Sequence, residues 1–388
     1  MRSVAITNIG SLVTNDKSLE LGLLGELQNA AIVIEDGNIA WVGSSLAVPD
    51  TDEQIDVEGR TILPGFVDSH AHLMFAGDRA SEFSARMAGE SYEAGGIRTT
   101  VAATRSSTDA ELEANLLRLT SELRASGITT FETKSGYGLS VVDEARALRI
   151  AVKHTPETTF LGAHVVPAEF EGRPDDYVAL VNGEMLNQVA DSAKWIDVFC
   201  DRGAFSVEQA REILLAGKTM GLQPRIHANQ LEQGGGIQLA VELDCASADH
   251  CTHFDRNDID ALAGSKTVAT LLPGAEFSTR AKYPNAGKLW EAGVKVAIAT
   301  DCNPGSSYTT SMAFCIAIAV RDMNFTVEQA IWSATKGGAK ALRRHDVGAI
   351  KVGMRADLVE LNAPSAIHLA YRPGVNLINK TYQSEDFK

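Results

Sequence analysis

The chain has 388 residues, of which 45% are hydrophobic and 22% charged, a composition typical of a globular protein. Its formal net charge of −15 at pH 7 argues against nucleic acid or an anionic membrane surface as a partner. The five cysteines show no CxxC spacing, which fits a cytoplasmic protein and neither a disulfide framework nor a structural zinc finger. The N-terminus has no apolar segment after Arg2, which argues against secretion, and the run MAFCIAIAV after Ser311 is too short to cross a bilayer.

The two ends of the chain have the same β-rich character. The first sixty residues hold short alternating or β-branched runs, with Asp36-Gly37 as a predicted hairpin turn. Residues 347–362 predict two more short strands around a glycine-rich turn. Neither end has enough apolar surface to fold alone, so we expect residues 1–62 and 346–388 to pair into one small β-domain, with a second domain at 63–345.

Eight strand-like runs lie between Gly65 and Asp301, separated by helical patterns. This alternation predicts right-handed crossovers and a parallel sheet, and eight units favour closure into a barrel. No GxGxxG or GxxxxGK[ST] motif follows a run, so nothing indicates a dinucleotide or nucleoside triphosphate site. We therefore expect an α/β protein: a (β/α)8 TIM-type barrel with a small β-sandwich domain built from both chain termini.

Two helices of the middle region carry start signals. The pattern DAELEANLLRLTSELRASG predicts a helix with Asp109 as its N-cap, a stripe of leucines and a stop at Gly127. The pattern SVEQ predicts a capping box between Ser206 and Gln209.

Most of the eight runs end in polar side chains. These are His70 with His72, Glu132 with Lys134, His164, Asp201, His227, His250, Glu276, and Asp301 with Asn303. The active site of a (β/α)8 barrel gathers at the C-terminal strand ends. Four of the eight runs end in histidine, in a chain with nine histidines, and packing alone does not explain that clustering.

The sharpest local signal is the HxH pair of His70 and His72. Residues two apart on a strand point to the same side, so both imidazoles can reach one ion at the barrel rim. His227 and Asp301 would complete a shell of three nitrogens and one oxygen, which suits Zn²⁺ or Fe²⁺. An isolated HxH can also be a surface or core pair, but further histidines at strand ends count against that.

Asp301 has a second interpretation, as the N-cap of the next helix. The NPGSS segment that follows offers Ser306 or Ser307 as better caps. We therefore expect Asp301 to point into the site.

Several motifs together resemble a known family. LPGFVDSHAH, a later His, the TDxN segment and a terminal GxxxxGxxADLV run are similar to the amidohydrolase superfamily. More narrowly, HAHLMFAGDRASEF, ETKSGYGL, GAHVVP, IHANQL, SADH and ATDCNPGS resemble the imidazolonepropionase family, which acts third in histidine breakdown. The resemblance covers nearly the whole chain.

The resemblance implies a metal-dependent barrel that hydrolyses 4-imidazolone-5-propanoate to N-formimino-glutamate, and a homodimer. It implies His70, His72, His227 and Asp301 as metal ligands. For the substrate it implies Arg79 and Tyr137 as holding residues, His164 at the ring, His250 beside the reacting carbonyl, and a pocket floor of Asn303, Gly305 and Ser306.

Two departures within the superfamily bear on the chemistry. Three residues beyond His227, related enzymes carry Glu or Gln; here it is Gln230, which can bind substrate but cannot take up a proton. Two-metal members use a carboxylated lysine on the fourth strand, where this chain has Cys200-Asp201, so we expect one ion, Zn²⁺ or Fe²⁺/Fe³⁺. Lys134 lies on the second strand and is expected to form a hydrogen bond or ion pair, with Glu132 as the candidate partner.

The residue types suggest a mechanism for opening a cyclic amide with water. A bound divalent ion lowers the pKa of its water to about 7. Asp301 would pass the water proton to the leaving nitrogen, while His250 would polarise the carbonyl; His250 is the alternative base. Arg79 offers a fork-shaped cation for the substrate carboxylate, although it could instead be a solvated partner of Asp78 or Glu82. His164 could likewise be a satisfied core histidine.

Two rival functions remain open from the sequence. One is a mononuclear deaminase of a purine or pyrimidine ring; Gln230, in place of the Glu that protonates the ring, counts against it. The other is a non-catalytic amidohydrolase-fold scaffold, against which the four retained metal ligands count.

Overall fold

The structure, a computed structural model, describes residues 2–89 and 96–388. The described residues group into two compact units. The first unit takes in those of Met1–Ser69, Ser121–Thr130 and Ser311–Lys388, and the second those of His70–Thr120 and Phe131–Thr310.

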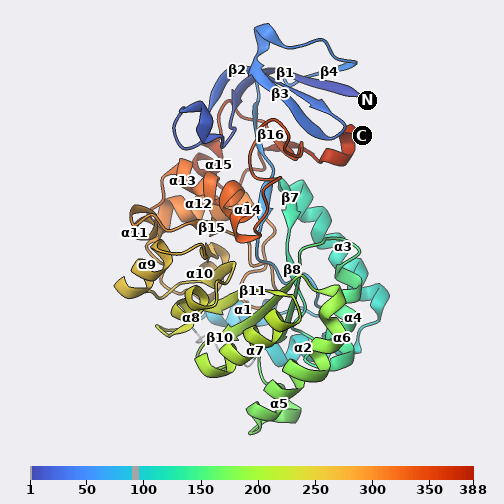
Figure 1. Cartoon of the computed structure of the whole chain (residues 1–388), viewed down its shortest axis with the longest axis vertical. Helices are drawn as coiled ribbons and strands as arrows, with labels where there is room; N and C mark the ends of the chain where they lie inside the picture. Colours follow the sequence, from blue (N-terminus) through green and yellow to red (C-terminus); the bar gives the residue numbers. More distant parts are fainter. Residues whose placement is uncertain (1, 90–95) are drawn as a thin grey trace. The chain divides into compact units, whose positions relative to one another are not determined.

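The first unit is built on a mixed sheet that contains strands from both ends of the chain (Figure 1). The strand order is β17-β16-β5-β1-β2-β3, and β4 pairs with β1. The strands are β1 (Ser3–Leu12), β2 (Leu27–Glu35), β3 (Asn38–Ser44), β4 (Glu53–Asp56), β5 (Thr61–Pro64), β16 (Leu358–Leu361) and β17 (Ile378–Tyr382). The expected pairing of the two ends and the hairpin turn at Asp36-Gly37 are both observed.

The prediction of two strands in residues 347–362 was wrong, because only β16 forms there. Gly348 and Gly353 have φ of 79° and 88°, so the backbone turns where an extended strand was expected. The second C-terminal strand is β17, which pairs antiparallel with β16.

Aliphatic side chains fill the interior of this sheet. Its core cluster includes Val4, Ile6, Ile9, Leu12, Ile32, Ile34, Ile62 and Leu358, each at most 1% exposed. The unit also contains the short pair of β6 (Phe66–Asp68) and β7 (Ile128–Phe131), and helices α12 (Met312–Asp322), α13 (Val327–Trp332), α14 (Gly338–Ala341) and α15 (His368–Tyr371).

The second unit is built on a curled parallel sheet with the strand order β15-β14-β13-β12-β10-β9-β8, in which β11 also pairs with β10. Its strands are β8 (Thr133–Lys134), β9 (Thr158–Ala163), β10 (Trp195–Cys200), β11 (Gln223–Pro224), β12 (Ile226–Ala228), β13 (Ser247–His250), β14 (Val268–Leu271) and β15 (Val296–Ile298). Together with β6 and β7, these strands fall within the eight runs predicted from the sequence, so the predicted strand positions are confirmed.

Helices separate these strands along the chain, and several surround β8 and β10 in Figure 1. They are α1 (Ala80–Met87), α2 (Ile97–Ser106), α3 (Asp109–Ala125), α4 (Val141–Ala151), α5 (Pro174–Leu180), α6 (Leu186–Val189), α7 (Val207–Thr219), α8 (Gly236–Glu242), α9 (Arg256–Ala263), α10 (Pro273–Thr279) and α11 (Ala286–Glu291). No helix in the described part of the chain is both long and apolar enough to span a membrane.

The predicted N-cap is confirmed at α7 and differs from the observed one at α3. The capping box of Ser206 and Gln209 at the start of α7 is confirmed. At α3 the predicted cap was one residue late: the Thr108 hydroxyl accepts a hydrogen bond from the Glu111 N–H at 3.2 Å, and the Glu111 side chain accepts from the Thr108 N–H at 2.8 Å. Asp109 is therefore the first helical residue, because Thr108 and Glu111 form the reciprocal pair.

The cap of α12 was also misplaced by the sequence analysis, which favoured Ser306 or Ser307. The observed cap is Ser311, whose hydroxyl accepts a hydrogen bond from the Phe314 N–H at 3.2 Å. Ser306 lies instead in a turn held by Asn303.

Residues 70–72 link the two ends of the parallel sheet through backbone hydrogen bonds. The His70 carbonyl accepts from the Asp301 N–H at 3.0 Å, and the His72 N–H donates to the Cys302 carbonyl at 3.0 Å. On the other side, the Ala71 carbonyl accepts from the Lys134 N–H at 3.2 Å. Side chains from the β15 and β8 ends of the sheet therefore meet around the HxH segment.

Candidate metal centre and active site

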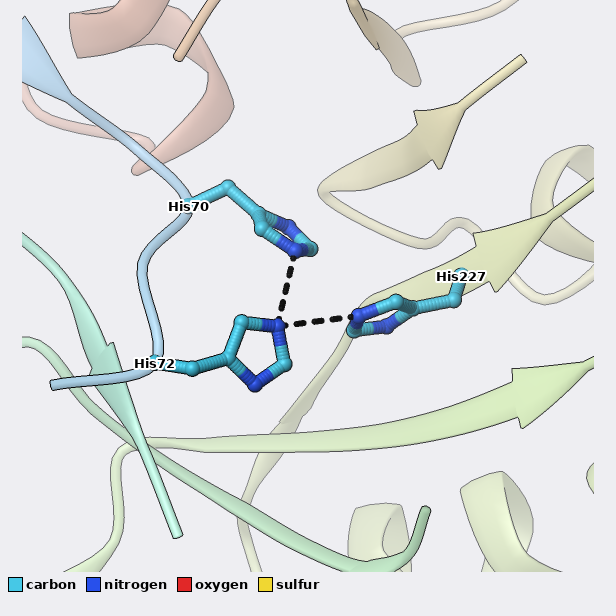
Figure 2. Close-up of side chains that lie close together, drawn as sticks. All are labelled: His70, His72 and His227. Carbon is cyan, nitrogen blue, oxygen red and sulfur yellow. Dashed lines mark hydrogen bonds between the residues drawn. The ribbon is translucent and has the colours of Figure 1, made fainter. Parts of the chain in front are cut away.

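Three buried histidines place their ring nitrogens close together at the C-terminal strand ends. The Nε2 atoms of His70 and His72 are 3.3 Å apart, and the Nε2 atoms of His72 and His227 are also 3.3 Å apart. The dashed lines of Figure 2 join these atoms, with His70 and His72 on one segment and His227 on β12. The HxH geometry expected from a period of two is thus observed, although the pair lies just beyond β6.

Asp301 completes this group of candidate ligands. Its Oδ1 lies 3.6 Å from Nε2 of His70 and 3.5 Å from Nε2 of His72. The carboxyl is 1% exposed, and burial raises its pKa well above the ordinary value. Asp301 lies three residues after the end of β15, and its backbone φ of 51° places it in the left-handed region.

Two further carboxylates hold the histidine rings from behind. Nδ1 of His70 lies 2.8 Å from an oxygen of Asp249, and Nδ1 of His227 lies 3.0 Å from an oxygen of Asp197. Burial opposes ionisation of Asp197, but the neighbouring His227 and Lys134 outweigh burial and lower the pKa of that carboxyl. An ionised carboxylate accepts a hydrogen bond from Nδ1–H, so each ring keeps its proton on Nδ1 and presents the lone pair of Nε2 to the centre.

The donor set fits a metal ion. Burial, followed by the positive charge of Lys134, holds the pKa of His70 well below its ordinary value, so this imidazole is neutral and able to ligate. The candidate donor atoms of His70, His72 and His227 all lie within 4.8 Å of one another, as do those of His70, His250 and Asp301. Imidazole nitrogen with carboxylate oxygen is a set that binds zinc and iron alike.

His250 stands at the end of β13 beside this group. Its ring centroid lies 5.3 Å from that of His227 and 5.8 Å from that of His70. Its φ of 75° is unusual for a residue with a side chain, and Cys251 follows with 47°. Burial, and then His227, lower the pKa of His250 well below its ordinary value. A neutral, buried imidazole at this place can donate or accept one hydrogen bond toward a bound molecule.

A cavity opens over the histidine cluster. It is lined by His72, Arg79, Ile97, Tyr137, His164, Val165, Phe199, His227, Gln230, His250, Asp301, Asn303, Gly305 and Ser306. Every site residue predicted from the sequence is on this wall except His70, which lies beneath it. The apolar part of the wall was not predicted from the sequence; it consists of Ile97, Val165 and Phe199. Apolar residues give no chemical signal in a sequence, although Val165 directly follows His164.

Arg79 is buried although it pairs with a neighbour. Its guanidinium donates to Glu82 with contacts of 2.6–3.0 Å, as the alternative interpretation expected, yet the residue is only 5% exposed and faces the cavity. A Cβ added at Gly305 would lie 2.3 Å from Nη1 of Arg79. Arg79 therefore packs directly on the backbone of Gly305, where an added methyl group would displace the guanidinium.

Tyr137 and His164 form the aromatic side of the cavity. Their ring centroids are 5.3 Å apart, and the His164 ring stacks on His72 at 5.3 Å. Nδ1 of His164 lies 2.9 Å from the Gly136 carbonyl, and burial lowers its pKa to about 3. His164 thus has the partner that a core histidine needs and still lines the cavity.

The turn that carries Tyr137 is held by a carboxylate that the sequence analysis did not single out. Glu144 in α4 accepts hydrogen bonds from the N–H groups of Gly136, Gly138 and Leu139 at 2.7–2.9 Å. The side chain is fully buried, which raises its pKa despite these bonds. A glutamate at a buried position of an amphipathic helix was the available signal.

Asn303 organises the loop after β15. Its Oδ1 accepts from the N–H groups of Gly305 and Ser306, both at 2.8 Å, and its amide donates to the Ser306 hydroxyl at 3.0 Å. The Ser306 hydroxyl in turn lies 3.4 Å from Oδ2 of Asp301. The TDxNPGS motif therefore builds a rigid turn beneath the candidate ligand.

The two other strand-end acids predicted from the sequence serve the loops. Asp201 accepts from the N–H groups of Gln230 and Leu231 at 2.6 and 2.9 Å and so fixes the loop that brings Gln230 to the cavity. Glu276 is buried and accepts from the Thr252 hydroxyl at 2.6 Å, two residues after His250.

Comparison with known proteins identifies the chain's relatives. The sequence matches the amidohydrolase family over residues 61–382. The chain belongs to the amidohydrolase family. The imidazolonepropionase of Streptomyces coelicolor is 62% identical over 377 residues, covering 97% of this chain and 96% of the relative. The imidazolonepropionase of Mycolicibacterium smegmatis is 61% identical over 378 residues, covering 97% of this chain and 96% of the relative.

Solved structures of other enzymes share the fold at low sequence identity. A guanine deaminase from C. acetobutylicum with bound guanine superposes with a TM-score of 0.72 at 16% identity, covering 99% of each chain. An ochratoxinase from A. niger gives a TM-score of 0.70 at 20% identity, covering 99% of this chain and 94% of the other. These likenesses establish the amidohydrolase fold and leave the choice of substrate to the more similar relatives.

Proposed function

We propose that the chain hydrolyses 4-imidazolone-5-propanoate to N-formimino-L-glutamate, as a step of histidine degradation in the cytoplasm. The observation that carries this proposal is the identity of about 60% to proteins named imidazolonepropionase over nearly the whole chain. The contents of the cavity agree with it, because a group of metal-ligating side chains and a buried arginine line the same wall.

The proposed cofactor is one divalent ion, Zn²⁺ or iron, held by His70, His72, His227 and Asp301. When bound, such an ion acts as a Lewis acid and supplies a nucleophile derived from water at neutral pH. The support from this chain is the neutral Nε2 face of the histidine rings, which Asp249 and Asp197 orient from the Nδ1 side.

Asp301 is the proposed proton shuttle. Its Oδ1 faces the histidines, while its Oδ2 is turned toward the Ser306 hydroxyl, 3.4 Å away. In the proposed reaction the attacking water forms a bond to the ring carbonyl carbon and gives its proton to Asp301. The amide C–N bond breaks, and Asp301 returns the proton to the leaving nitrogen. Gln230 cannot take this part, since an amide accepts no proton at neutral pH.

His250 is proposed as the electrostatic partner of the reacting carbonyl. A neutral imidazole that donates to a developing oxyanion contributes about 3 kcal/mol, by analogy with other single oxyanion donors. The position of His250 beside His227, on the wall of the cavity, supports this role. His250 as the general base is the alternative for the same step.

Arg79 and Tyr137 are proposed to hold the propanoate tail. Arginine recognises a carboxylate with two parallel N–H donors, and the burial of Arg79 strengthens such a pair. His164 would contact the imidazolone ring, and Gln230, Asn303, Gly305 and Ser306 would shape the rest of the wall. A substrate with a carboxylate gives the buried guanidinium a counter-charge beyond Glu82.

We also propose the finer architecture. The parallel sheet closes into a (β/α)8 barrel spanning residues 63–345, which the backbone hydrogen bonds of residues 70–72 to both ends of the parallel sheet support. Residues 1–62 and 346–388 would form the β-sandwich domain, supported by the shared sheet of the two ends. A homodimer is the proposed assembly, with no nucleic-acid or membrane partner.

The test is the decay of freshly prepared 4-imidazolone-5-propanoate with purified protein of measured metal content, followed by detection of N-formimino-glutamate. We expect turnover that a chelator abolishes and that Arg79→Ala abolishes at ordinary substrate concentrations. Arg98→Ala is the matched control, because the side chain of Arg98 on α2 is 65% exposed. Absence of turnover with one ion bound per chain would contradict the proposal and turn the search to ammonia release from purines and pyrimidines.

A further inference from the structure

Five charged side chains lie together in the interior of the second unit, beneath the candidate metal ligands. We call them the interior charge cluster: Glu132, Lys134, Asp197, Arg225 and Asp249, each at most 1% exposed. They come from four strands of the parallel sheet or the residues beside them, namely β8, β10, β12 and β13. The proposed function uses Asp197 and Asp249 to orient two histidine rings, and it gives the other three no part.

Two cations connect the three carboxylates. The Lys134 ammonium lies 3.0 Å from Oε1 of Glu132 and 3.0 Å from Oδ2 of Asp197. The Arg225 guanidinium donates to Oδ2 of Asp249 at 3.1 and 3.2 Å and comes within 3.8 Å of Oε1 of Glu132. The cluster is therefore continuous, with Glu132 shared by both cations.

Each carboxylate of the cluster also touches one part of the candidate metal site. Asp197 holds His227, and Asp249 holds His70, each through Nδ1. The other oxygen of Glu132 accepts from the N–H of Ala71 at 3.1 Å, the residue between the two histidines of the HxH pair. All three carboxylates that hold the site are therefore paired with Lys134, with Arg225 or with both.

Stability alone does not explain such a cluster. Removing charges from water costs several kcal/mol per ion, and well-packed apolar residues in the same place are often at least as stabilising. A parallel strand interior is ordinarily filled with branched apolar side chains. The cluster therefore points to a requirement for fixed positions, which rigid, mutually paired charges satisfy better than rotatable apolar groups.

We infer that Lys134 is a positioning residue that fixes His227 of β12 relative to the HxH segment. Its ammonium holds Asp197 and Glu132 at once. Without the ammonium, two buried carboxylates lose a shared counter-ion and separate or recruit water. The ring of His227 and the backbone at Ala71 then lose their fixed relation. This inference rests on the proposed metal site and extends it to residues that contact no substrate.

The experiment measures metal binding without substrate. Lys134→Met removes the ammonium and keeps the length of the side chain. The dissociation constant for Zn²⁺ is measured by competition with a chromophoric chelator, and the visible absorption of the Co²⁺-loaded protein reports the geometry of the ligands. We expect the Zn²⁺ dissociation constant to rise about 10- to 100-fold, the usual effect of losing a residue that orients a ligand, and the Co²⁺ bands to change.

Lys194→Met is the matched control. The Lys194 ammonium lies 2.8 Å from the buried carboxylate of Glu157, so the substitution also breaks a lysine–glutamate pair of this sheet. Lys194 and Glu157 precede β10 and β9, at the N-terminal edge of the sheet and away from the metal ligands at its C-terminal edge. We expect this variant to lose stability while binding Zn²⁺ as the parent does and giving the same Co²⁺ spectrum.

Unchanged or tighter Zn²⁺ binding by Lys134→Met, with an unchanged Co²⁺ spectrum, would overturn the inference. If that variant does not fold, Asp197→Asn tests the same link, since it keeps the shape of the side chain and removes its charge; parent-like binding there would also overturn it. A protein that binds Zn²⁺ but leaves the imidazolone intact would defeat the proposed function and leave this inference standing.

Discussion

The sheet of the first unit and the parallel sheet of the second enclose different kinds of interior. The first is filled by aliphatic side chains such as Ile6, Ile9 and Ile32. The second contains Lys134 and Arg225, both fully buried, with their carboxylate partners. Apolar burial stabilises a fold without direction, whereas paired charges fix atoms at given distances at a cost in desolvation. The aliphatic cluster accordingly serves stability, and the interior charge cluster serves the placement of ligands.

The comparison predicts opposite outcomes for substitutions in the two regions. The largest expected effect is that of Asp301→Asn on kcat. Loss of the proposed proton shuttle should lower kcat by about 1,000-fold, within the range seen for general acid–base residues. The free energy of unfolding should not fall, because burial already disfavours the charged carboxyl. Steady-state kinetics and urea unfolding measure the two quantities. Asp322→Asn on α12 is the control, and a kcat within threefold of the parent for Asp301→Asn would refute the role.

In the first unit, Ile6→Ala should do the reverse. Ile6 is fully buried in the aliphatic cluster, so truncation should lower the free energy of unfolding by about 2–5 kcal/mol. The kcat of the protein that remains folded should be unchanged. Leu46→Ala, at a site that is 98% exposed, should change stability by less than about 0.5 kcal/mol. If Ile6→Ala instead lowered kcat at full stability, the division of labour would be wrong.

Glu276 tests the comparison through the pH dependence of the free energy of unfolding. Burial raises its pKa from 4.5 to about 7, so the neutral form is favoured in the folded protein. Its stabilising contribution is present below pH 4.5 and is lost as the pH rises toward and through 7. Glu276→Gln should therefore gain stability over the parent between pH 5 and pH 8, by up to roughly 3 kcal/mol.

Urea unfolding of the parent and of Glu276→Gln at pH 5 and at pH 8 measures this gain in stability. Glu171→Gln, whose side chain is 73% exposed, should show no such trend. A difference between Glu276→Gln and the parent that stays constant with pH would contradict the assignment.

The smallest expected effect concerns the fit around Arg79. In Gly305→Ala the new methyl would meet Nη1 of Arg79 at 2.3 Å, so the guanidinium must move. We expect KM to rise about 10-fold, equivalent to roughly 1.4 kcal/mol, with a smaller change in kcat. Gly183→Ala, where nothing lies within 4 Å of the new Cβ, should leave KM unaltered. An unchanged KM in Gly305→Ala would mean that Arg79 does not need its observed position.

The strands and the polar residues at the strand ends could be predicted from the sequence because their signals are local, whereas Arg79, Tyr137 and the loop residues of the cavity were implied by the family resemblance. Runs of β-branched residues mark strands, and polar residues at the ends of such runs mark the rim of a parallel sheet. The interior charge cluster is partly visible in the sequence as well, since Glu132 and Lys134, and likewise Arg225 and His227, lie two apart within predicted strand-like runs.

Which charge meets which could not be predicted in the same way. The pairing of Lys134 with Asp197, or of Asp249 with His70, depends on the alignment of strands that are distant in sequence. The pairing of Lys134 with Glu132 was predictable only because the two lie in one strand-like run of the sequence. The caps at Thr108 and Ser311 were missed for a smaller reason, since several adjacent side chains could serve and the choice rests on backbone angles.

The sheet of the first unit also has a consequence for the synthesis of the chain. β5 lies between β1 and β16, so one of the two partners of β5 is synthesised roughly 300 residues after it. At 5–20 residues per second, the ribosome needs about 15–60 seconds to supply that partner. Throughout that interval the N-terminal strands offer an unpaired edge to any neighbouring chain. Completion of this sheet therefore requires β16, so a strand made late in the chain protects the edge of a strand made early.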